Sequence, residues 1–556
     1  MDQASHQHPI AYFCAEYGLE SRLPIYAGGL GVLAGDTLKA AADANLPMVG
    51  IGLLYHGQAA HQHITAEGLQ QEQDHFFDPV DAGLEHVYVD DQPLFVRVHL
   101  TELDIWLQCW QKKIGPGVTL YLLDTHNDQN ASSQRDIMCA LYSGTQEEVV
   151  KQQLLLGIGG VKLLKSLGIK PCFFHVNEGR PAFLHWQLVR QYMDEHGVDH
   201  YQARQHAIKH TVYTNHTLVG AGNQSYPRWL IGKYAAYYAD KMGISLDELL
   251  ADGIGQDPDR FEVTTFALNT SARASGVSRI HTSLSEQTWP RYDWVNVTNG
   301  VHLPSWQDRQ LPQLVDDRAG LWRRRLDNKH QLNQFVIERT GYGFDPNRLV
   351  IGWARRIAGY KHLEWLFADV ERLRALLAND QRPVQLLVAG KAHFLDDGGK
   401  RLLQEVIGYM QRQLSGWALF IPDYDLDVAR RLVQGSDVWL NTPEPGMEAS
   451  GTSGMKAMAN GALSLSVADG WVPEVDWSDK GWIIDPAQPS QSIYTLLERD
   501  IVPLYYQRDQ QGLPLEWLER MGRSIRQAEQ FSAARMVREY VDRLYPQECF
   551  HHPSDG

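Results

Sequence analysis

The sequence predicts an α/β fold built on two doubly wound parallel sheets, one in each half of the chain. Short apolar runs alternate with helical patterns, as where RLVIGWA is followed by LEWLFADVERLRALL. Near the N-terminus, a glycine-rich turn separates a buried strand from a helix, which is typical of the same fold class. A chain of 556 residues is also too long for a single hydrophobic core.

The first half opens with a strand–helix–strand unit, IAYFCAEYG, PIYAGGLGVLAGDTLKAAADA and PMVGIGLLY. Residues 56–123 then alternate polar and apolar side chains, so we expect antiparallel hairpins inserted on the first sheet. The elements expected after them are helices at 146–168 and 180–197 around a strand at 171–179, a strand and loop at 210–222, a helical region at 234–287, a strand at 295–302 and a connecting helical region at 304–332.

The second half alternates more regularly. The predicted strands are 348–354, 383–390, 417–421, 436–442 and 463–469, and the helices between them include 363–377, 401–414 and 426–435. An amphipathic helix is expected at 529–545. The predicted domains are residues 1–330, residues 331–510, and a helical tail of residues 511–556 that packs back across both.

Composition excludes some function classes. The formal net charge of −16 argues against nucleic-acid binding. The N-terminus lacks the basic and apolar regions of a signal peptide, and no apolar run could span a bilayer, so we expect no membrane partner and a cytoplasmic location. Five scattered cysteines without a CxxC pair suggest reduced thiols. His61 and His63 would share a strand face, but without nearby cysteine or carboxylate partners we expect no metal.

The segment EASGTSGMK, directly after the strand SDVWLNT, is the strongest candidate for chemistry. Its glycines and hydroxyl residues make a loop whose backbone N–H groups can bind a phosphate at a helix start. Lys456 would lie in the first helical turn, as a counter-charge or a Schiff-base lysine. A lone glycine-rich loop more often serves backbone geometry only. The loop ARRIAGYK, with Arg355, Arg356 and Lys361 after another strand, adds an anion site and favours a phosphate function.

Together with these two loops, five further motifs resemble the α-glucan (glycogen, starch and maltodextrin) phosphorylases, especially their shorter bacterial type: YAGGLGVLAGDTLK, NEGRPAF, YTNHT, SGVSRIH and TNGVHLPSW. The resemblance covers residues 10–545. It implies a GT-B fold, in which two Rossmann-like domains face a central cleft. It also implies a pyridoxal 5′-phosphate (PLP) enzyme that transfers a glucosyl unit between an α-1,4-glucan end and inorganic phosphate, giving glucose 1-phosphate with retention. A homodimer is a further expectation from the family.

The resemblance also implies residue roles. Lys456 matches the lysine that forms the PLP Schiff base, and the cradle of the PLP phosphate matches Gly451, Thr452, Ser453 and Arg355. The cofactor-binding set further includes Gly29, whose backbone N–H would also assist the substrate phosphate. The residues expected to be catalytic are Lys456, Arg356, Lys361, His216 and Glu448. Those expected to bind the sugar or lie in the active-site region are Glu448, Ser450, Tyr360, Asn299, His216 and Glu16.

Elementary electrostatics fits these roles, because two phosphates in contact repel each other and need concentrated cations. The carboxylate of Glu448 is therefore expected to serve sugar hydroxyls and to avoid the phosphates. Two departures from the family pattern bear on acceptor preference and regulation: Arg180 and Pro181 replace a His and a small residue, and residues 147–153 lack the usual arginines. The sequence shows no long N-terminal regulatory extension, so we expect activity without phosphorylation. The alternatives are a catalytically inactive glucan-binding relative and a PLP-free nucleotide-sugar glycosyltransferase of GT-B fold.

Overall fold

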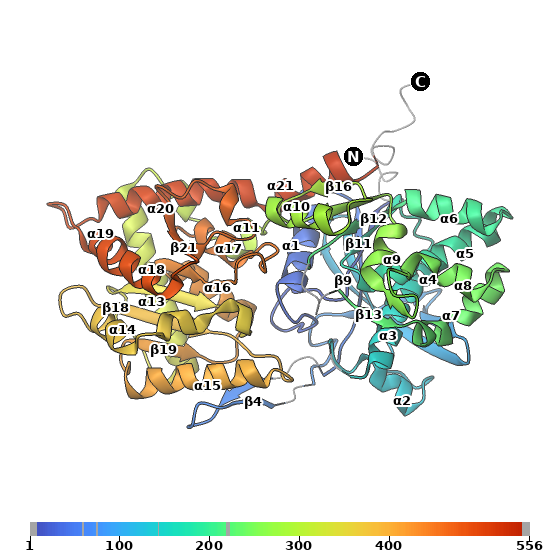
Figure 1. Cartoon of the computed structure of the whole chain (residues 1–556), viewed down its shortest axis with the longest axis horizontal. Coiled ribbons are helices and arrows are strands. Elements are labelled where there is room, and N and C mark those ends of the chain that lie inside the picture. The colour runs from blue at the N-terminus through green and yellow to red at the C-terminus, as the bar shows by residue number, and fades with distance from the viewer. Residues whose placement is uncertain (1–7, 58–60, 74–75, 143, 218–222, 547–556) are drawn as a thin grey trace, which may run out of the picture. The chain divides into compact units, whose positions relative to one another are not determined.

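The computed structural model describes residues 8–57, 61–73, 76–142, 144–217 and 223–546 (Figure 1). The described chain divides into two units. The first comprises residues up to 57, from 76 to 298 and from 536 to 546, and the second comprises residues 61–73 and 299–535. No helix within the described ranges combines the length and the apolar character needed to cross a membrane.

A mixed sheet forms the centre of the first unit. Its strands, in spatial order among the described residues, are β16 (Trp294–Asn296), β15 (Arg273–Gly276), β12 (Thr211–Thr214), β11 (Phe173–Asn177), β1 (Ile10–Phe13), β2 (Met48–Leu53), β10 (Val118–Asp124), β9 (Leu103–Gly115) and β5 (Glu85–His86), with β8 (Phe95–Leu100) also paired to β9. The strands from β16 to β10 run parallel, and β9, β8 and β5 add antiparallel pairs. Every residue of β1 and β2 is buried, which explains their continuous apolar sequences.

The helices of the first unit follow the predicted pattern, with a difference at residues 146–168. There a π-helical turn (Leu155–Gly159) separates α3 (Gln146–Leu154) from α4 (Gly160–Ser166). The other main helices are α1 (Gly29–Asp43), α5 (Leu184–His196), α6 (His200–Lys209), α7 (Arg228–Met242), α9 (Val263–Asn269) and α10 (Arg279–Thr288). The predicted helical region at 234–287 was wrong for β15, because its small and polar residues lack a strand's apolar pattern.

The second sheet has six parallel strands within the described residues. Their order is β19 (Ala418–Ile421), β18 (Val384–Ala389), β17 (Leu349–Ala354), β20 (Val438–Asn441), β21 (Leu463–Val467) and β22 (Gly481–Ile484). The chain proceeds outward from β17 to β19 and then returns to β20, on the other side of β17. This reversal is a topological switch point, where ligands bind outside the carboxyl ends of the strands. The prediction of α/β units with doubly wound parallel sheets is confirmed.

Helices surround this sheet: α13 (Arg318–Thr340), α14 (Val370–Leu377), α15 (Asp397–Arg412), α16 (Leu426–Gly435), α17 (Ser453–Ala459), α18 (Pro489–Leu496) and α20 (Leu515–Gln527). Buried charges fix α13 against the sheet. Asp437, just before β20, accepts hydrogen bonds from Arg325 Nε at 3.0 Å and from Lys329 Nζ at 2.7 Å, and all three residues are fully buried. Burial lowers the pKa of Lys329 to about 8, although Asp437 opposes that shift.

The hairpin of β3 (His61–Ile64) and β4 (Gln70–Gln73) corrects one prediction. Residues 56–123 were expected to add hairpins to the first sheet. The prediction is confirmed for β8, β9 and β10, which join the first sheet. By contrast, β3 and β4 pair only with each other and belong to the second unit. There β4 lies beside α15 (Figure 1). The alternating pattern of a strand does not reveal which sheet the strand will join.

The end of the described chain belongs to the first unit. From residue 536 onward, this part includes the second half of α21 (Ala533–Glu539) and the π-helical turn that follows it (Tyr540–Leu544). The Tyr545 hydroxyl contacts His175 Nδ1 in β11 at 2.8 Å. The prediction of reduced thiols is right for Cys14, Cys109 and Cys139 and wrong for Cys172, which is disulfide-bonded.

Candidate active site

The glycine-rich loop follows β20 and leads into α17. Gly451 has a φ of +85°, a backbone conformation that residues with a side chain rarely adopt. Its carbonyl oxygen accepts a hydrogen bond from Trp471 Nε1 at 3.1 Å. Gly454 lies against the same indole, because a Cβ added there would be 3.1 Å from Trp471 Cζ2. The glycines therefore let the loop and the helix start pack closely on a buried tryptophan.

A buried cluster of Arg355, Lys361 and Glu448 lies where the loops after β17 and β20 meet. Lys361 Nζ donates a hydrogen bond to Glu448 Oε2, and Arg355 Nη1 donates to the same oxygen at 3.4 Å. The three side chains are only 8–13% exposed. Arg355 Nη2 lies 3.4 Å from Ser453 Oγ at the start of α17. The loop at residues 354–361, called the cation loop below, and the loop at residues 448–456, called the glycine loop, thus form one site.

Glu448 is held in its ionised form. Burial alone would raise the pKa of its carboxyl, but the charges of Lys361 and Arg355 outweigh burial and lower that pKa below its usual value. From the sequence, this carboxylate is expected to serve sugar hydroxyls. In the structure it pairs with two cations, because a buried charge without a partner is costly. The backbone N–H of Glu448 also donates to Asp469 Oδ2 at 2.9 Å.

Three buried polar atoms of predicted site residues have no hydrogen-bond partner within the described chain. They are Arg355 Nε, Ser450 Oγ and Asn299 Oδ1. Buried polar groups are normally paired, so an unpaired donor or acceptor is suited to a bound ligand. Asn299 is otherwise fixed by its backbone, whose carbonyl oxygen accepts from Arg535 Nη2 at 2.9 Å.

Lys456 is buried on α17 against an aromatic ring. Its side-chain nitrogen lies 3.7 Å from the centre of the Trp306 ring, a close cation–π contact. Trp306 ends α11 (Leu303–Trp306), and its carbonyl oxygen accepts a hydrogen bond from Asn460 Nδ2 at 3.0 Å, just beyond the end of α17. The amine of Lys456 is therefore directed into the protein by a fixed aromatic surface.

In the first unit, Glu16 organises the start of α1. Its Oε2 accepts hydrogen bonds from the backbone N–H groups of Ala27 at 2.8 Å and Gly28 at 3.2 Å, and its Oε1 accepts from the Tyr142 hydroxyl at 2.5 Å. Only 2% of Glu16 is exposed. A Cβ at Gly28 or Gly29 would meet no atom within 4 Å, so the backbone at this helix start is open to close approach by a ligand.

His216 and Glu178 lie after the adjacent strands β12 and β11. His216 Nε2 is 2.7 Å from Asn177 Oδ1, and the His216 backbone N–H donates to Glu178 Oε2 at 3.0 Å. Burial lowers the pKa of His216 to about 3, so the imidazole is neutral, and burial raises the pKa of Glu178 to about 7. Glu178 also has a φ of +69°, which is uncommon outside glycine and concentrates at functional sites.

The two departures from the family pattern take different positions. Arg180 is buried, with only 8% of its surface exposed. Its guanidinium lies 4.3 Å from the centre of the Tyr142 ring. It therefore touches the side chain that supports Glu16. Glu147, in the second departure, forms ion pairs with Lys233 at 2.8 Å and Lys151 at 3.5 Å on a more exposed surface.

The predicted residues divide between the two units. Those gathered on the loops after β17 and β20 and on α17 are Arg355, Arg356, Tyr360, Lys361, Glu448, Ser450, Gly451, Thr452, Ser453 and Lys456. Asn299 also belongs to the second unit, and Glu16, Gly29 and His216 belong to the first. The predicted roles do not include Glu178, Tyr142, Trp306 or Asp469. The sequence nevertheless carried a signal for three of them, since Glu178 lies in NEGRPAF directly after a buried strand, Trp306 ends the motif TNGVHLPSW, and Asp469 ends the predicted strand 463–469.

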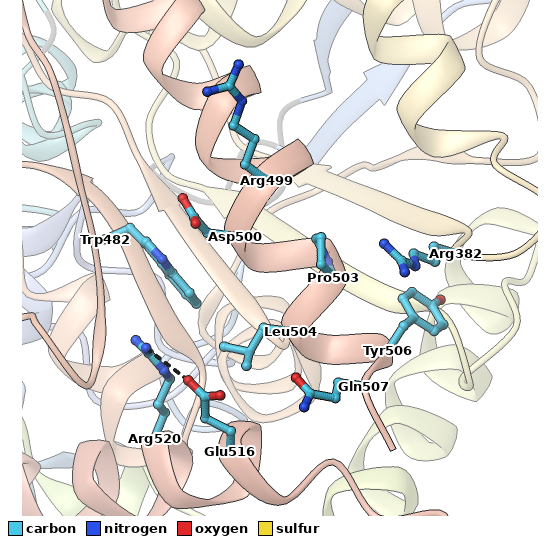
Figure 2. A pocket seen from close by; sticks show the side chains of 10 residues that line it. All are labelled: Arg382, Trp482, Arg499, Asp500, Pro503, Leu504, Tyr506, Gln507, Glu516 and Arg520. Atoms are coloured by element: carbon cyan, nitrogen blue, oxygen red, sulfur yellow. Dashed lines mark hydrogen bonds and ion pairs between the residues drawn. The ribbon is translucent and has the colours of Figure 1, made fainter. Parts of the chain in front are cut away.

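A polar hollow of about 520 Å³ lies elsewhere in the second unit (Figure 2). Around it, Trp482 faces the guanidinium of Arg520, which donates to Glu516 at 3.3 Å. The full lining is Arg382, Trp482, Arg499, Asp500, Pro503, Leu504, Tyr506, Gln507, Glu516 and Arg520. None of the predicted site residues is among these side chains.

Comparison with known proteins agrees with the geometry. Residues 309–477 match the family model described as carbohydrate phosphorylase. The chain is 35% identical to the maltodextrin phosphorylase of Thermococcus litoralis over 97% of its own length and 70% of that protein. It is 35% identical to the glycogen phosphorylase of Mycobacterium tuberculosis (96% and 70%) and 32% identical to that of Aquifex aeolicus (97% and 86%). The chain belongs to the carbohydrate phosphorylase family.

Proposed function

We propose that this chain is an α-1,4-glucan phosphorylase. It catalyses the reversible phosphorolysis of glycogen or maltodextrin at the non-reducing end and forms α-D-glucose 1-phosphate with retention. The observation that carries the proposal is the switch point of the second sheet. There the cation loop after β17 meets the glycine loop and the lysine-bearing helix after β20, as an enzyme that handles phosphate groups requires.

The residues of this site fit PLP. Lys456 would hold the cofactor covalently, and its buried position against Trp306 suits an amine that must be kept unhydrated. The 5′-phosphate would be held by the loop of Gly451, Thr452 and Ser453, together with Arg355, whose Nε is buried without a protein acceptor in the described chain. When bound, PLP would supply a second phosphate group that exchanges protons with the substrate phosphate.

Arg356 and Lys361 would bind and orient the substrate phosphate. Arg356 is exposed and its Nη2 lies 3.4 Å from the Tyr360 hydroxyl, while Lys361 is buried and paired with Glu448. A phosphate oxygen then bonds to C1 of the terminal glucosyl unit as the bond from C1 to the glycosidic oxygen breaks, and the proton of the inorganic phosphate passes to that oxygen. The phosphate anion stabilises the positive charge that develops on the sugar.

Further predicted residues would bind the sugar. Glu448, Ser450 and Tyr360 would hold glucose hydroxyls, and Asn299 offers an acceptor, Oδ1, that is unpaired within the described chain. In the first unit, neutral His216 would act as a hydrogen-bonding group for the sugar, fixed by its contact with Asn177. Glu16 would support the backbone that leads to Gly29, through its hydrogen bonds with the N–H groups of Ala27 and Gly28. A homodimer and a cytoplasmic location stay predictions.

The test combines cofactor detection with product formation. We expect the purified protein to show PLP absorbance, and borohydride reduction followed by peptide mapping should place a pyridoxyl group on Lys456. We also expect glucose 1-phosphate from maltodextrin and phosphate. Lys456→Ala should lose both PLP and turnover, whereas Lys165→Ala, at an exposed lysine paired with Glu195, should lose neither.

Each alternative gives a different result. PLP on Lys456 without glucose 1-phosphate would identify an inactive glucan-binding relative. A folded protein without PLP that transfers sugar from a nucleotide donor would identify a glycosyltransferase. Turnover by Lys456→Ala would refute the proposed role of this lysine.

A further inference from the structure

The hairpin of β3 and β4 places two buried glutamine side chains in the second unit. Gln62 is 6% exposed and Gln70 is 7% exposed, whereas the next residue of β4, Gln71, is exposed. Gln62 Nε2 donates to Gln70 Oε1 at 2.8 Å, so the two amides form a continuous pair. Glutamine is seldom fully buried, and a buried amide pair in a short hairpin calls for an explanation from its partners.

Most of these partners are backbone groups just beyond the carboxyl end of β18; in addition, Gln70 Nε2 donates to the Glu72 carboxylate at 2.6 Å. Gln62 Nε2 donates to the Gly390 carbonyl oxygen at 2.8 Å. Gln70 pairs with Ala392 in both directions: its Nε2 donates to the Ala392 carbonyl at 2.9 Å, and its Oε1 accepts from the Ala392 N–H at 3.0 Å. On the other side, Gln62 Oε1 accepts from the Asp423 N–H at 2.8 Å. The two amides thus link residues 390–392 to Asp423, beyond the ends of the paired strands β18 and β19.

The backbone of residues 390–392 in turn holds the cation loop through backbone contacts. Beyond the end of β17, the Arg355 N–H donates to the Ala389 carbonyl at 3.3 Å and the Ile357 N–H donates to the Lys391 carbonyl at 2.9 Å. Ile357 also forms a parallel bridge with Ala392. A Cβ at Gly390 would be 2.1 Å from the Arg355 carbonyl oxygen, so the two segments are in close contact. The loop from Arg355 to Lys361 therefore depends on a segment whose other edge is paired by glutamine side chains.

A charged contact fixes the hairpin against the loop after β19. The carboxylate of Asp423 accepts from Lys391 Nζ at 2.6 Å, from His61 Nδ1 at 2.7 Å and from the Gln62 N–H at 3.1 Å. Burial would raise the pKa of Asp423, but Lys391 and the hydrogen bonds lower it to about 2. The carboxylate is therefore ionised at neutral pH, and it joins the hairpin to the end of the sheet.

We propose that Gln62 and Gln70 are positioning residues for the phosphate-binding cations of the loop Arg355–Lys361. This inference rests on the proposed function, because that function assigns the substrate phosphate to Arg356 and Lys361. Within the described residues, no hydrogen bond joins either glutamine to Arg356 or Lys361. They act through residues 390–392, which hold the backbone from which the cations extend. Their loss should therefore weaken the use of phosphate more than the use of glucan.

The test uses the PLP-loaded enzyme and the variants Gln70→Ala and Gln62→Ala/Gln70→Ala. Gln71→Ala is the matched control, since it removes an exposed amide from the same strand. By hydrogen exchange and mass spectrometry, we expect peptides covering residues 355–361 and 390–392 to exchange roughly tenfold faster or more in the glutamine variants, because the Ala392 groups lose their partner. We expect the KM for phosphate to rise roughly tenfold, while the KM for maltodextrin and the PLP content stay near wild type.

Unchanged exchange at residues 355–361, or an equal rise in both KM values, would overturn the inference. If the double variant does not fold, Gln70→Ala alone decides between these results. If the wild type forms no glucose 1-phosphate, the proposed function fails. Hydrogen exchange would still test the positioning role in that case. Faster exchange at residues 355–361 in Gln70→Ala would support the positioning of the loop by the glutamines, and unchanged exchange would refute that positioning.

Discussion

Replacing Gly451 by alanine tests whether the glycine-rich loop is a phosphate cradle. Gly451 has a φ of +85°, and an added Cβ would lie 3.1 Å from Cγ of Glu448. A left-handed backbone costs an L-residue roughly 1–2 kcal/mol, and the tight contact must also displace Glu448. If the loop relaxes when it holds no phosphate, this strain opposes PLP binding. At 1.4 kcal/mol per factor of ten, we expect PLP to dissociate at least about 5- to 30-fold more readily.

Gly446 provides the matched control in the same loop. Its φ is +81°, but a Cβ there would meet no atom within 4 Å. Gly446→Ala therefore carries a similar backbone cost without the contact to Glu448, and because Gly446 lies outside the predicted cradle of Gly451, Thr452 and Ser453, that cost is the same with and without PLP. PLP retention would be measured by absorbance after stepwise dialysis of both variants, with thermal unfolding as the measure of stability. We expect similar losses of stability and a loss of PLP only in Gly451→Ala. Equal PLP retention in the two variants would refute the cradle.

Three further predictions concern charges. The pKa of Glu448 is lower in the folded than in the unfolded protein, so its ionised carboxylate stabilises the fold. This stabilisation is present above the unfolded-state pKa of about 4.3 and is lost as the pH falls through the lower folded-state pKa. Between pH 6 and 3 the Tm of wild type should therefore fall more steeply than that of Glu448→Gln, and parallel curves would contradict this. Arg356→Ala should raise the KM for phosphate about tenfold or more while PLP stays bound; release of PLP would reverse the phosphate assignments. Asp437→Asn leaves two buried cations without their carboxylate, so the free energy of unfolding measured in denaturant should fall by about 3–5 kcal/mol. Asp427→Asn, at an exposed ion pair, should lower it by less than about 1 kcal/mol, and equal losses in the two variants would contradict this prediction.

The second sheet was predictable because its signals are local. Each of its first five strands is a short apolar run, and each run is separated from the next by a helical or glycine-rich segment. The strand β15 was not predictable in this way, since Arg273–Gly276 has small and polar side chains and is a strand only through its pairs with β12 and β16. The hairpin β3–β4 was recognisable as a hairpin, but its place in the second unit depends on contacts with residues more than 300 positions away.

The candidate site was predictable to the extent that its motifs follow strands. Arg355 and Lys361 follow β17, and Glu448 precedes a glycine-rich helix start, so their proximity follows from the sheet topology. What the sequence could not supply is the pairing among them. Nothing in the order of residues indicates that Glu448 binds both cations, or that Trp306 faces Lys456. These contacts arise from loops that meet only after the strands are assembled.

The proposed binding of two phosphates requires a concentration of positive charge, and this creates a structural difficulty, because the cations also repel each other when no phosphate is bound. The chain meets this difficulty in two ways. Glu448 neutralises part of the charge directly, through Lys361 and Arg355. The loop backbone is meanwhile held by the ladder to residues 390–392 rather than by the charged side chains themselves. Because Lys361 is paired with Glu448, an incoming phosphate must compete with a carboxylate for it, and a firmly held backbone keeps that competition from displacing the cations.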